Sequence, residues 1–266
     1  MAFSVGSDPE FFLRNKTGKH VTGIGTIGGT KKHPRMAKHG SVQEDGCAVE
    51  LNSVPSTNMQ DFIANHNLIL GELEDMLKPL DLELDLYSPS VIFEKDLLLS
   101  DQALVSGCDP DYNAWTVSEN EIVDLYDTPI RAAGGHLHVQ FEGCASVQDR
   151  VDFTRVLDYQ LGVPAVLVDT DSNRRTLYGK AGAHRPKFME KDGFNGIEYR
   201  TLSNFWLRSN QLMAYVYQQV EYCNKHWKDL IQDADYLGEE IQDIINRGDA
   251  QDAAAFCDYN TVTTYV

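Results

Sequence analysis

The segment Gly134-Gly135-His136-Leu137-His138-Val139 is the part of the sequence that most constrains the fold. It predicts a strand over 135–141, and on a strand residues two apart point to the same face. His136 and His138 therefore share a face, from which they can bind a metal ion or a nucleotide phosphate. The two glycines allow another backbone segment to approach closely. The alternative is a pair of core histidines with satisfied hydrogen bonds and no ligand.

A second strand is predicted around 195–201, where Gly196-Ile197-Glu198-Tyr199-Arg200 places an acid and a base two residues apart. Glu198 is suited to hold a hard cation, and Arg200 can fork onto a carboxylate or a phosphate. A simple cross-strand ion pair is the alternative for this segment.

Two further strands carry carboxylates near the amino terminus. Residues 3–13 predict a strand broken by Pro9, on which Asp8 and Glu10 share a face. Residues 47–54 predict a strand on which Glu50 and Asn52 share a face. Neighbouring carboxylates repel each other unless a cation lies between them. The alternative is that each is an ordinary strand with one polar face.

Helices are predicted between and after the strands. Apolar residues recur at helical spacing after Ser56 or Thr57, as the N-cap, up to Pro79. Ser146 and Asp149 resemble a capping box for a helix over roughly 147–162, whose apolar face includes Val147, Val151, Leu157 and Leu161.

The order of these elements predicts the fold class. A glycine-rich turn or hairpin is expected over 18–32, and a long helical stretch from about 204 to 246. Strands and helices follow one another without a regular βαβ rhythm, which favours an α+β fold with a largely antiparallel sheet. No repeat or linker marks a boundary, so we expect a single domain over 1–266 with a helical C-terminal part from about 204.

The composition limits the function classes. The 266 residues include 23 lysines and arginines against 40 acids, a formal charge of −17, so we expect no nucleic-acid surface and no attraction to anionic membranes. No apolar run approaches the roughly 20 residues of a membrane helix. The first residues do not read as a secretory signal, and the five cysteines include no C-x-x-C pair. A cytoplasmic protein with reduced thiols is expected.

A basic cluster interrupts this acidic chain between residues 173 and 187. It consists of Arg174, Arg175, Lys180, Arg185 and Lys187. Such a cluster favours phosphate binding, and Gly179 and Gly182 suit a mobile flap over a nucleotide. A solvated basic loop is the alternative. Residues 28–32 lack the spacing of a Walker A sequence.

Taken in order, these segments resemble the catalytic domain of the glutamine synthetase superfamily. The run Gly-x-Asp-Pro-Glu-Phe-Phe-Leu, the pair Val49-Glu50, the Gly-Gly-His-Leu-His strand and the Ile-Glu-Tyr-Arg strand each resemble a metal- or substrate-binding strand of those enzymes. With Gly-Cys-Asp-Pro-Asp-Tyr-Asn-Ala over 107–114 and Glu-Tyr-Arg-Thr-Leu-Ser-Asn-Phe-Trp, the chain is similar to the phage-type COOH-NH2 ligase family, type 2. The resemblance spans about residues 4–206. It implies a curved, mainly antiparallel sheet, a partial barrel, that carries the site and is flanked by helices.

The resemblance also implies an activity and a set of site residues. The activity is an ATP-dependent carbon–nitrogen ligase that joins a carboxylate to an amine through an acyl-phosphate, with Mg²⁺ or Mn²⁺ as the cation. The implied metal ligands are Asp8, Glu10, Glu50, His136 and Glu198. Arg175, Lys180, Arg185 and Arg200 are implied to contact phosphate or carboxylate, and His138 to support the nucleotide. Arg185, Arg200 and Glu50 are the expected catalytic groups. Glu50, Asp45 and Asp109 remain alternatives for the base that deprotonates the amine.

Several points stay open at this stage. The first motif starts at residue 6, so the sequence is not expected to include the amino-terminal β-grasp domain of glutamine synthetases, and neither the oligomeric state nor ammonia as the amine follows. The substrates are small-molecule or peptide carboxylates and amines whose identity the sequence does not give.

A cupin-like metal oxygenase is the rival enzyme, because His136-x-His138-x-x-x-Glu142 fits half of a cupin motif. A catalytically inactive phage protein that binds a nucleotide or a partner is the rival without an activity. A phage protein would act in the host cytoplasm.

Overall fold

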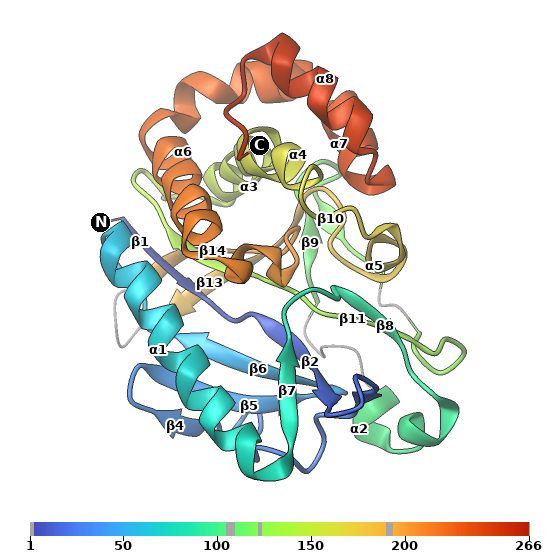
Figure 1. Ribbon diagram of the computed structural model, residues 1–266. Helices are drawn as coiled ribbons and strands as arrows, with labels where there is room; N and C mark the ends of the chain where they lie inside the picture. Colours follow the sequence, from blue (N-terminus) through green and yellow to red (C-terminus); the bar gives the residue numbers. More distant parts are fainter. Residues whose placement is uncertain (1–2, 105–109, 122–123, 190–193, 266) are drawn as a thin grey trace.

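The computed structural model describes residues 3–104, 110–121, 124–189 and 194–265 (Figure 1). In this part of the chain, every paired strand runs antiparallel to its neighbour, as predicted. The first sheet has the order β1 (Ser4–Ser7), β12 (Leu137–Gln140), β14 (Phe194–Tyr199), β13 (Ala183–Met189), β9 (Tyr112–Asn113) and β10 (Ser118–Glu119). The second has the order β3 (His20–Val21), β2 (Glu10–Asn15), β6 (Ala48–Ser53), β5 (Gly40–Asp45) and β4 (Arg35–Ala37), with β7 (Leu82–Asp85) also paired to β2. A third, small sheet pairs β8 (Ser90–Ile92) with β11 (Ile130–Ala132).

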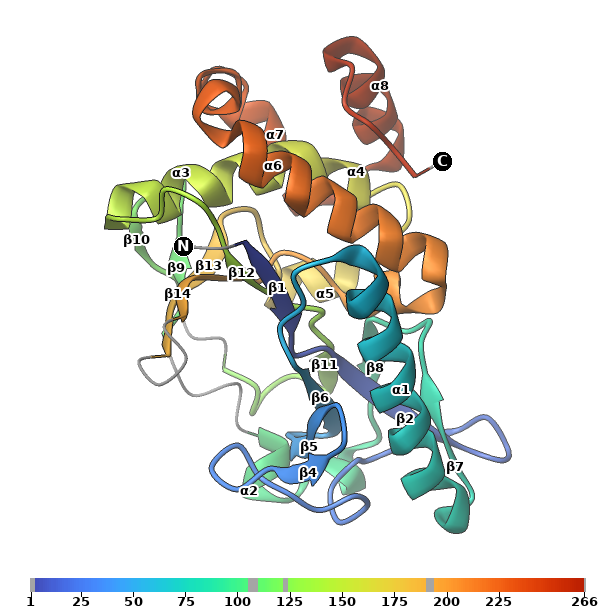
Figure 2. The ribbon, with the colours of Figure 1, turned by 90° about the vertical axis from the view of Figure 1, so that its left-hand side faces the viewer.

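The two large sheets meet where β1 passes into β2. β1 pairs with β12 in the first sheet, whereas β2 pairs with β6 in the second. Asp8 and Pro9 form the break between them, as predicted, because proline cannot donate a hydrogen bond to a strand ladder. The backbone of Glu10 then donates to Gly134 O at 2.9 Å, which holds the start of β2 against the segment before β12. The joined strands curl into a half-barrel with helices on its outer side (Figure 2).

Helix α1 (Met59–Leu77) covers the second sheet (Figures 1 and 2). Its fully buried apolar side chains include Ile69, which lies beside Gly40 of β5, and Phe62, whose ring lies 5.6 Å from that of Trp206. Its N-cap is Asn58, whose side chain accepts from the backbone of Asp61 at 2.9 Å, so the predicted cap at Ser56 or Thr57 is wrong. The helix ends before Pro79, as predicted.

The segment from α3 (Val147–Leu157) through α4 (Val163–Ala165) lies with α6 (Asn210–Tyr236) on the outer face of the first sheet. The predicted capping box is confirmed, since Ser146 Oγ accepts from the backbone of Asp149 and Asp149 accepts from the backbone of Ser146. A π-helix, η3 (Asp158–Gly162), separates α3 from α4. Val151 is buried on the predicted apolar face, but Val147 is 68% exposed because it occupies the first position of the helix.

The C-terminal part is helical from residue 204, as predicted, but in several pieces. These are the 3₁₀-helix η4 (Asn204–Arg208), α6, α7 (Gly238–Arg247) and α8 (Ala250–Asn260), of which α8 was not predicted. The shorter helices of the described chain are η1 (Lys78–Leu80), η2 (Lys95–Leu98), α2 (Asp101–Leu104) and α5 (Ser172–Leu177). Crossing a bilayer requires more apolar length than any helix of the described ranges offers.

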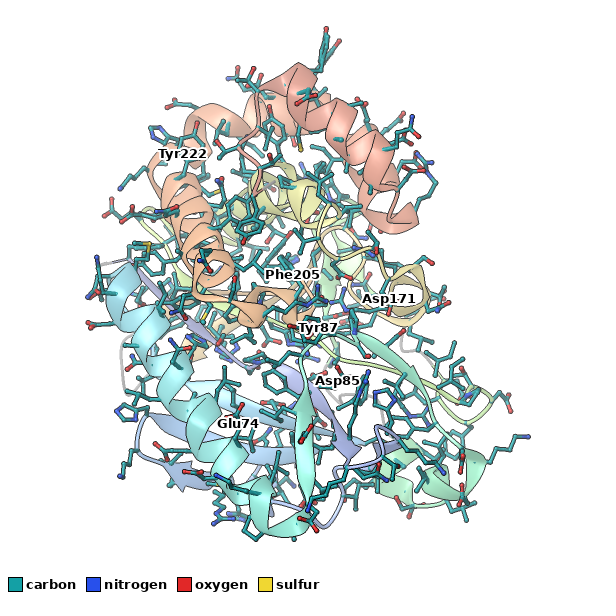
Figure 3. The ribbon with its side chains drawn as sticks, in the orientation of Figure 1. Glu74, Asp85, Tyr87, Asp171, Phe205 and Tyr222 are labelled. Atoms are coloured by element: carbon teal, nitrogen blue, oxygen red, sulfur yellow. The ribbon has the colours of Figure 1, made fainter. Side chains whose placement is uncertain are left out.

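Helix η4 ties the helical layer to the strands near the sheet junction. Phe205 of this helix, labelled in Figure 3, is fully buried, and η4 packs against α6. The neighbouring Asn204 donates from Nδ2 to Glu10 O at 2.7 Å, and Trp206 donates from Nε1 to Gly135 O at 3.1 Å. The backbone on both sides of the junction is therefore fixed by side chains from the C-terminal part.

Candidate active site

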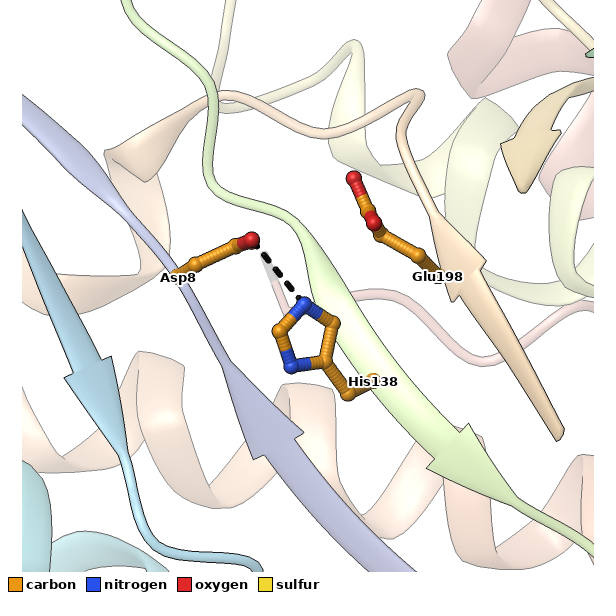
Figure 4. Close-up of side chains that lie close together, drawn as sticks. All are labelled: Asp8, His138 and Glu198. Atoms are coloured by element: carbon orange, nitrogen blue, oxygen red, sulfur yellow. Dashed lines mark ion pairs between the residues drawn. The ribbon is translucent and has the colours of Figure 1, made fainter. Parts of the chain in front are cut away.

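Two groups of acidic and histidine side chains lie at the junction of the two sheets. The Asp8 cluster consists of Asp8, His138 and Glu198 (Figure 4), and the Glu10 cluster consists of Glu10, Asp45 and Glu50. In each cluster one ligand atom per residue lies within 4.8 Å of those of the other two. This is the spacing at which three side chains can share one cation.

Strand register brings the Asp8 cluster together. His138 on β12 is directly opposite Glu198 on β14 and also opposite Gly6 on β1, two residues before Asp8. Directly opposed residues present their side chains on the same face of a sheet, a few ångströms apart. His138 Nε2 consequently lies 3.0 Å from Asp8 Oδ2.

The Glu10 cluster forms in the same way in the second sheet. Glu10 on β2 is opposite Glu50 on β6, and Asp45 ends the neighbouring strand β5. Asn52, which shares the face of Glu50 as predicted, donates from Nδ2 to Glu50 Oε1 at 2.9 Å. The backbone of Gly134 donates to Glu10 Oε2 at 2.8 Å. Asp8 and Glu10 thus belong to adjacent clusters, because the chain changes sheet between them.

His136 is buried beside the Asp8 cluster. Its Nδ1 lies 3.2 Å from Asp8 Oδ1 and 3.7 Å from Glu198 Oε1, and Tyr178 Oη contacts its Nε2 at 2.8 Å. Burial, together with the nearby charge of Arg200, lowers the pKa of His136 to about 3. The ring is therefore neutral at physiological pH.

The two glycines before His136 are required by close contacts, as predicted. A Cβ atom on Gly134 would overlap the imidazole of His136, and one on Gly135 would overlap the carbonyl of Ser203. Any larger residue would push β12 away from η4 or displace the histidine.

Burial and mutual repulsion set the ionisation of the acids. Burial, reinforced by Asp45, raises the pKa of Glu10 to about 8. Burial and the neighbouring acids Asp8 and Asp45 raise the pKa of Glu50 well above its usual value, and burial with Asp8 raises the pKa of Glu198. Burial also acts to raise the pKa of Asp8, but attraction to His138 and hydrogen bonds from both histidines hold it well below its ordinary value. A bound cation would remove the repulsion and favour the ionised acids.

Three cations surround Glu198. Arg200 Nη1 and Arg185 Nη1 both contact Glu198 Oε1, the latter at 3.4 Å, and Lys187 Nζ lies 3.9 Å from Glu198 Oε2. Lys187 Nζ also lies 2.7 Å from His138 Nε2. Arg200 in turn donates from Nε to Asp111 Oδ2 at 3.0 Å. These cations border the Asp8 cluster, where an anion bound beside a metal ion would meet them.

The other predicted phosphate ligands lie elsewhere. Arg175 is buried, and its guanidinium donates to the carbonyl oxygens of Asp169 and Asp171, at 2.8 and 2.7 Å. Lys180 is exposed in the turn between α5 and β13. The described structure thus brings Arg185 and Arg200 together with the clusters, but not Arg175 or Lys180.

The basic segment over 173–187 is part of the packed fold, so the prediction of a mobile flap is wrong. Its first arginines lie on α5 and its last cations on β13, inside the first sheet. Arg174 is fully buried and donates to the carbonyl oxygens of Ala133, Thr201 and Leu202. A guanidinium that neutralises backbone carbonyls in the interior fixes the segment that carries it.

Sequence reasoning missed several neighbours of the clusters. Asp45 was considered only as a base, and Asp111 and Tyr178 were not singled out. Asp109, the third candidate base, lies outside the described residues.

Two cavities, of about 510 and 470 Å³, lie away from both clusters, one beside Ser90 and Asp171 and the other between α7 and α8. The convergence of ligand atoms, rather than cavity volume, marks the candidate site.

Comparison with solved structures shows a likeness of fold at low sequence identity. A bifunctional glutathione synthetase from Pasteurella multocida aligns with a TM-score of 0.50 and 10% identity over 98% of this chain and 49% of its own. GmaS in complex with ADP and a novel glutamine synthase homolog cover 99% of this chain, and 71% and 69% of theirs, at 10% and 9% identity, with TM-scores of 0.39 and 0.37. The chain spans about half the length of the glutathione synthetase. The likeness to it supports the α+β fold with a curled antiparallel sheet.

Comparison of sequences gives one family. No curated protein matches the chain. Residues 128–258 match the sequence model described as phage phiEco32-like COOH.NH2 ligase-type 2, and this range includes His136, His138, Glu198 and Arg200. The match confirms the resemblance to the COOH-NH2 ligase type 2 family that the motifs indicated.

Proposed function

We propose that this chain is an ATP-dependent ligase that joins a carboxylate to an amine through an acyl-phosphate and releases ADP and phosphate. The observation that carries the proposal is the pair of adjacent clusters bordered by Arg185, Lys187 and Arg200. The family match supports a carboxylate–amine ligase. We also propose that residues 1–266 form one such domain, since a continuous buried core includes residues from Val5 to Val262.

The residues of both clusters fit divalent cations. The Glu10 cluster offers only carboxylate oxygens, which Mg²⁺ prefers, and the Asp8 cluster adds an imidazole, which Mn²⁺ also accepts. Asp8 Oδ1 is buried, and its contact with His136 Nδ1 at 3.2 Å leaves it a lone pair for a bound cation. His136 contacts Asp8 and Glu198, so it either joins this cluster or orients its members.

The protein groups then have distinct roles. Divalent ions, when bound, would neutralise charge on the phosphates during transfer. Arg185, Lys187 and Arg200 lie where they can bind the oxygens of the transferred phosphoryl group, and an arginine fork can bind two at once. Asp45 and Glu50 remain the described candidates for taking the proton of the amine, because each is a carboxylate at the same junction.

The rival oxygenase is less well supported. Its motif needs Glu142 beside His136 and His138, but Glu142 is exposed beyond the end of β12. Its backbone nitrogen and oxygen bind Asn224 and Trp227 of α6 instead. In the described chain, His138 is grouped with Asp8 and Glu198.

A labelled carboxylate tests the proposal directly. The protein is incubated with Mg-ATP, a panel of amines and carboxylic acids carrying ¹⁸O, and the products are analysed by mass spectrometry. An acyl-phosphate route transfers one ¹⁸O to the released phosphate and yields a condensed amide. Glu198→Gln is expected to abolish both, whereas Asp243→Asn, on the exposed face of α7, is the matched control.

The outcomes separate the alternatives. Phosphate without ¹⁸O would show hydrolysis or another transfer and would contradict the acyl-phosphate. Binding of Mg-nucleotide without turnover on any pair would favour the inactive binding protein. The substrate pair that gives the labelled phosphate identifies the carboxylate and the amine.

A further inference from the structure

Asp158 is a buried carboxylate on the helical side of the first sheet that the proposed chemistry does not use. It is the first residue of the π-helix η3 and is fully buried. Four donors converge on it. Oδ1 accepts from Tyr199 Oη at 2.7 Å and from Thr201 Oγ1 at 3.1 Å, and Oδ2 accepts from Trp115 Nε1 at 2.7 Å and from the backbone of Gly182 at 2.5 Å.

These donors come from the segments that carry the cations of the site. Tyr199 and Thr201 flank Arg200 in sequence, so both neighbours of that arginine are held by one carboxylate. Gly182 comes just before β13, the strand of Arg185, and Trp115 lies in the turn between β9 and β10, shortly after Asp111, the partner of Arg200. Because side chains alternate along β14, Tyr199 points toward the helices while Glu198 and Arg200 point toward the clusters.

Asp158 lies on a π-helical turn and not on a regular α-helix. π-helical turns are rare and often occur at functional sites. Gly162, the last residue of the π-helix, leaves room for Tyr199, because a Cβ there would come within 2.7 Å of Tyr199 Oη. The charge is not neutralised by an ion pair in the described structure. Burial raises the pKa of Asp158 to about 6 in spite of the four donors, so the group is ionised at pH 7.5.

We propose that Asp158 is the positioning residue that sets the placement of Arg200, and with it Arg185 and Asp111, from behind the sheet. The inference rests on the proposed function only for its kinetic consequence. Structurally, one carboxylate links three segments whose ends reach the site, so a loosened Asp158 would let them shift relative to one another. A misplacement of about 1 Å is enough to lower a rate about 100-fold.

The test compares Asp158→Asn with Asp169→Asn in the full chain. Asp169 is also buried and helps to fix a guanidinium, that of Arg175, but within the described residues its carboxylate has no bond to the segments of the site. Asparagine keeps the shape of the side chain but replaces one of the two oxygens by an NH₂ group, so the two donors that bind that oxygen lose their acceptor. We expect Asp158→Asn to lower kcat about 10- to 100-fold with Mn²⁺ affinity, measured by calorimetry, changed less than about 2-fold. Asp169→Asn should leave kcat within about 2-fold of the wild type.

Two NMR signals provide a readout that does not depend on turnover. The Trp115 indole N–H reports the bond to Asp158, and the Arg200 Nε–H, which binds Asp111, reports the position of the arginine. Both signals are expected to shift or broaden at pH 7.5 in Asp158→Asn and to stay in place in Asp169→Asn. If Asp158→Asn does not fold, Tyr199→Phe removes one donor and is judged by the same signals and a kcat loss of about 3- to 10-fold.

Each result decides a separate question. Absence of turnover by the wild type contradicts the proposed ligase, and the Arg200 signal then decides the role of Asp158 alone. An Arg200 signal that is unchanged in Asp158→Asn overturns the inference, as does a kcat equal to that of Asp169→Asn. A shifted Arg200 signal together with a selective loss of kcat supports it.

Discussion

Tyr178 lies between the histidine and the arginine of the candidate site. Its hydroxyl contacts His136 Nε2 at 2.8 Å, and the guanidinium of Arg200 lies 4.8 Å from the centre of its ring. The neutral His136 accepts from this hydroxyl, because its other nitrogen faces Asp8. A single side chain therefore orients two groups of opposite function, one beside the acids and one beside the cations.

The two roles of Tyr178 predict different effects for two substitutions. Tyr178→Phe removes the hydroxyl and keeps the ring, so it is expected to destabilise the protein by about 1 kcal/mol and to weaken Mn²⁺ binding several-fold. Tyr178→Leu also removes the ring and should in addition raise KM for the nucleotide, because the cation–π contact is lost. Urea unfolding, calorimetry with Mn²⁺ and steady-state kinetics measure the three quantities. Equal Mn²⁺ affinity in Tyr178→Phe and the wild type would contradict a role in orienting His136.

The Glu10 cluster predicts a conflict between stability and metal binding. Three carboxylates within one cluster repel one another, and Asp45 raises the pKa of Glu10. Asp45→Asn removes one charge, so in chelator it should stabilise the protein by about 0.5–1 kcal/mol. In excess Mn²⁺ the order should reverse, because the variant has lost a ligand. Thermal unfolding with and without Mn²⁺ measures both. A variant less stable than the wild type under both conditions would show that Asp45 has a purely structural role.

For single residues, the alternation of side chains along a strand predicted which residues on regular strands belong to the candidate site. His138, Glu198, Glu10 and Glu50 follow from period-two patterns, and the structure places each of them in a cluster. Asp111 directly precedes β9 and Tyr178 directly follows α5, and outside the regular elements the pattern gives no direction for a side chain. Arg175 shows the converse limit, because sequence cannot distinguish an arginine that binds phosphate from one that binds interior carbonyls.

Helix α1 is locked to β1 by a chain of buried polar groups. His66 Nδ1 donates to Phe62 O at 2.6 Å, so its Nε2 accepts from Ser7 Oγ at 2.6 Å, and Ser7 Oγ contacts Ser53 Oγ at 3.1 Å. His66 is fully buried, and burial lowers its pKa to about 4. The contact fixes the end of β1 directly before Asp8. Protonation of His66 would turn its acceptor nitrogen into a donor, reverse the bond to Ser7 and place a charge in the fully buried interior.

This buried histidine predicts acid sensitivity in a defined window. Because the folded state holds His66 neutral, the unfolded state binds more protons between pH 6.5 and about 4, so the stability is lost as the pH falls through that range. A shift of this size corresponds to on the order of 3 kcal/mol. His66→Gln cannot be protonated and should lose less stability between pH 7 and pH 4.5. Urea unfolding at the two pH values measures the difference. An equal loss in both proteins would assign the acid sensitivity to other groups.

Elements with a strong local signal were predicted well, and those that depend on a partner were not. The capping box of α3 and the break at Pro9 are local, and both are confirmed. Strands β4 and β5 were missed, because Gly40–Asp45 has a weak apolar pattern of its own and gains its order from pairing with β6. The N-cap of α1 was misplaced because several consecutive residues there are acceptable caps.

The two clusters lie side by side because the chain passes from one sheet to the other between β1 and β2. No local pattern shows which sheet each of these strands joins. Asp8 and Glu10 were expected to share one face of a single strand, but the chain crosses from the first sheet to the second between them. The ligands of both clusters come from five strands and the β1–β2 junction, spread from residue 8 to residue 198. Only the family resemblance predicted that these residues lie together, because period-two patterns alone do not say which distant strands pair.

The charge of the whole molecule predicts how the proposed nucleotide substrate would approach the site. The chain carries a formal charge of −17, whereas the cations at the Asp8 cluster are local. Raising the ionic strength from about 10 to about 150 mM shortens the Debye length from about 30 to about 8 Å. This screens repulsion from distant surface acids more strongly than contacts inside the site. The kcat/KM for Mg-nucleotide is therefore expected to rise a few-fold with KCl at saturating, constant free Mg²⁺. An equal osmolality of sucrose is the control, and a fall with KCl would mean that the local cations dominate the approach of the nucleotide.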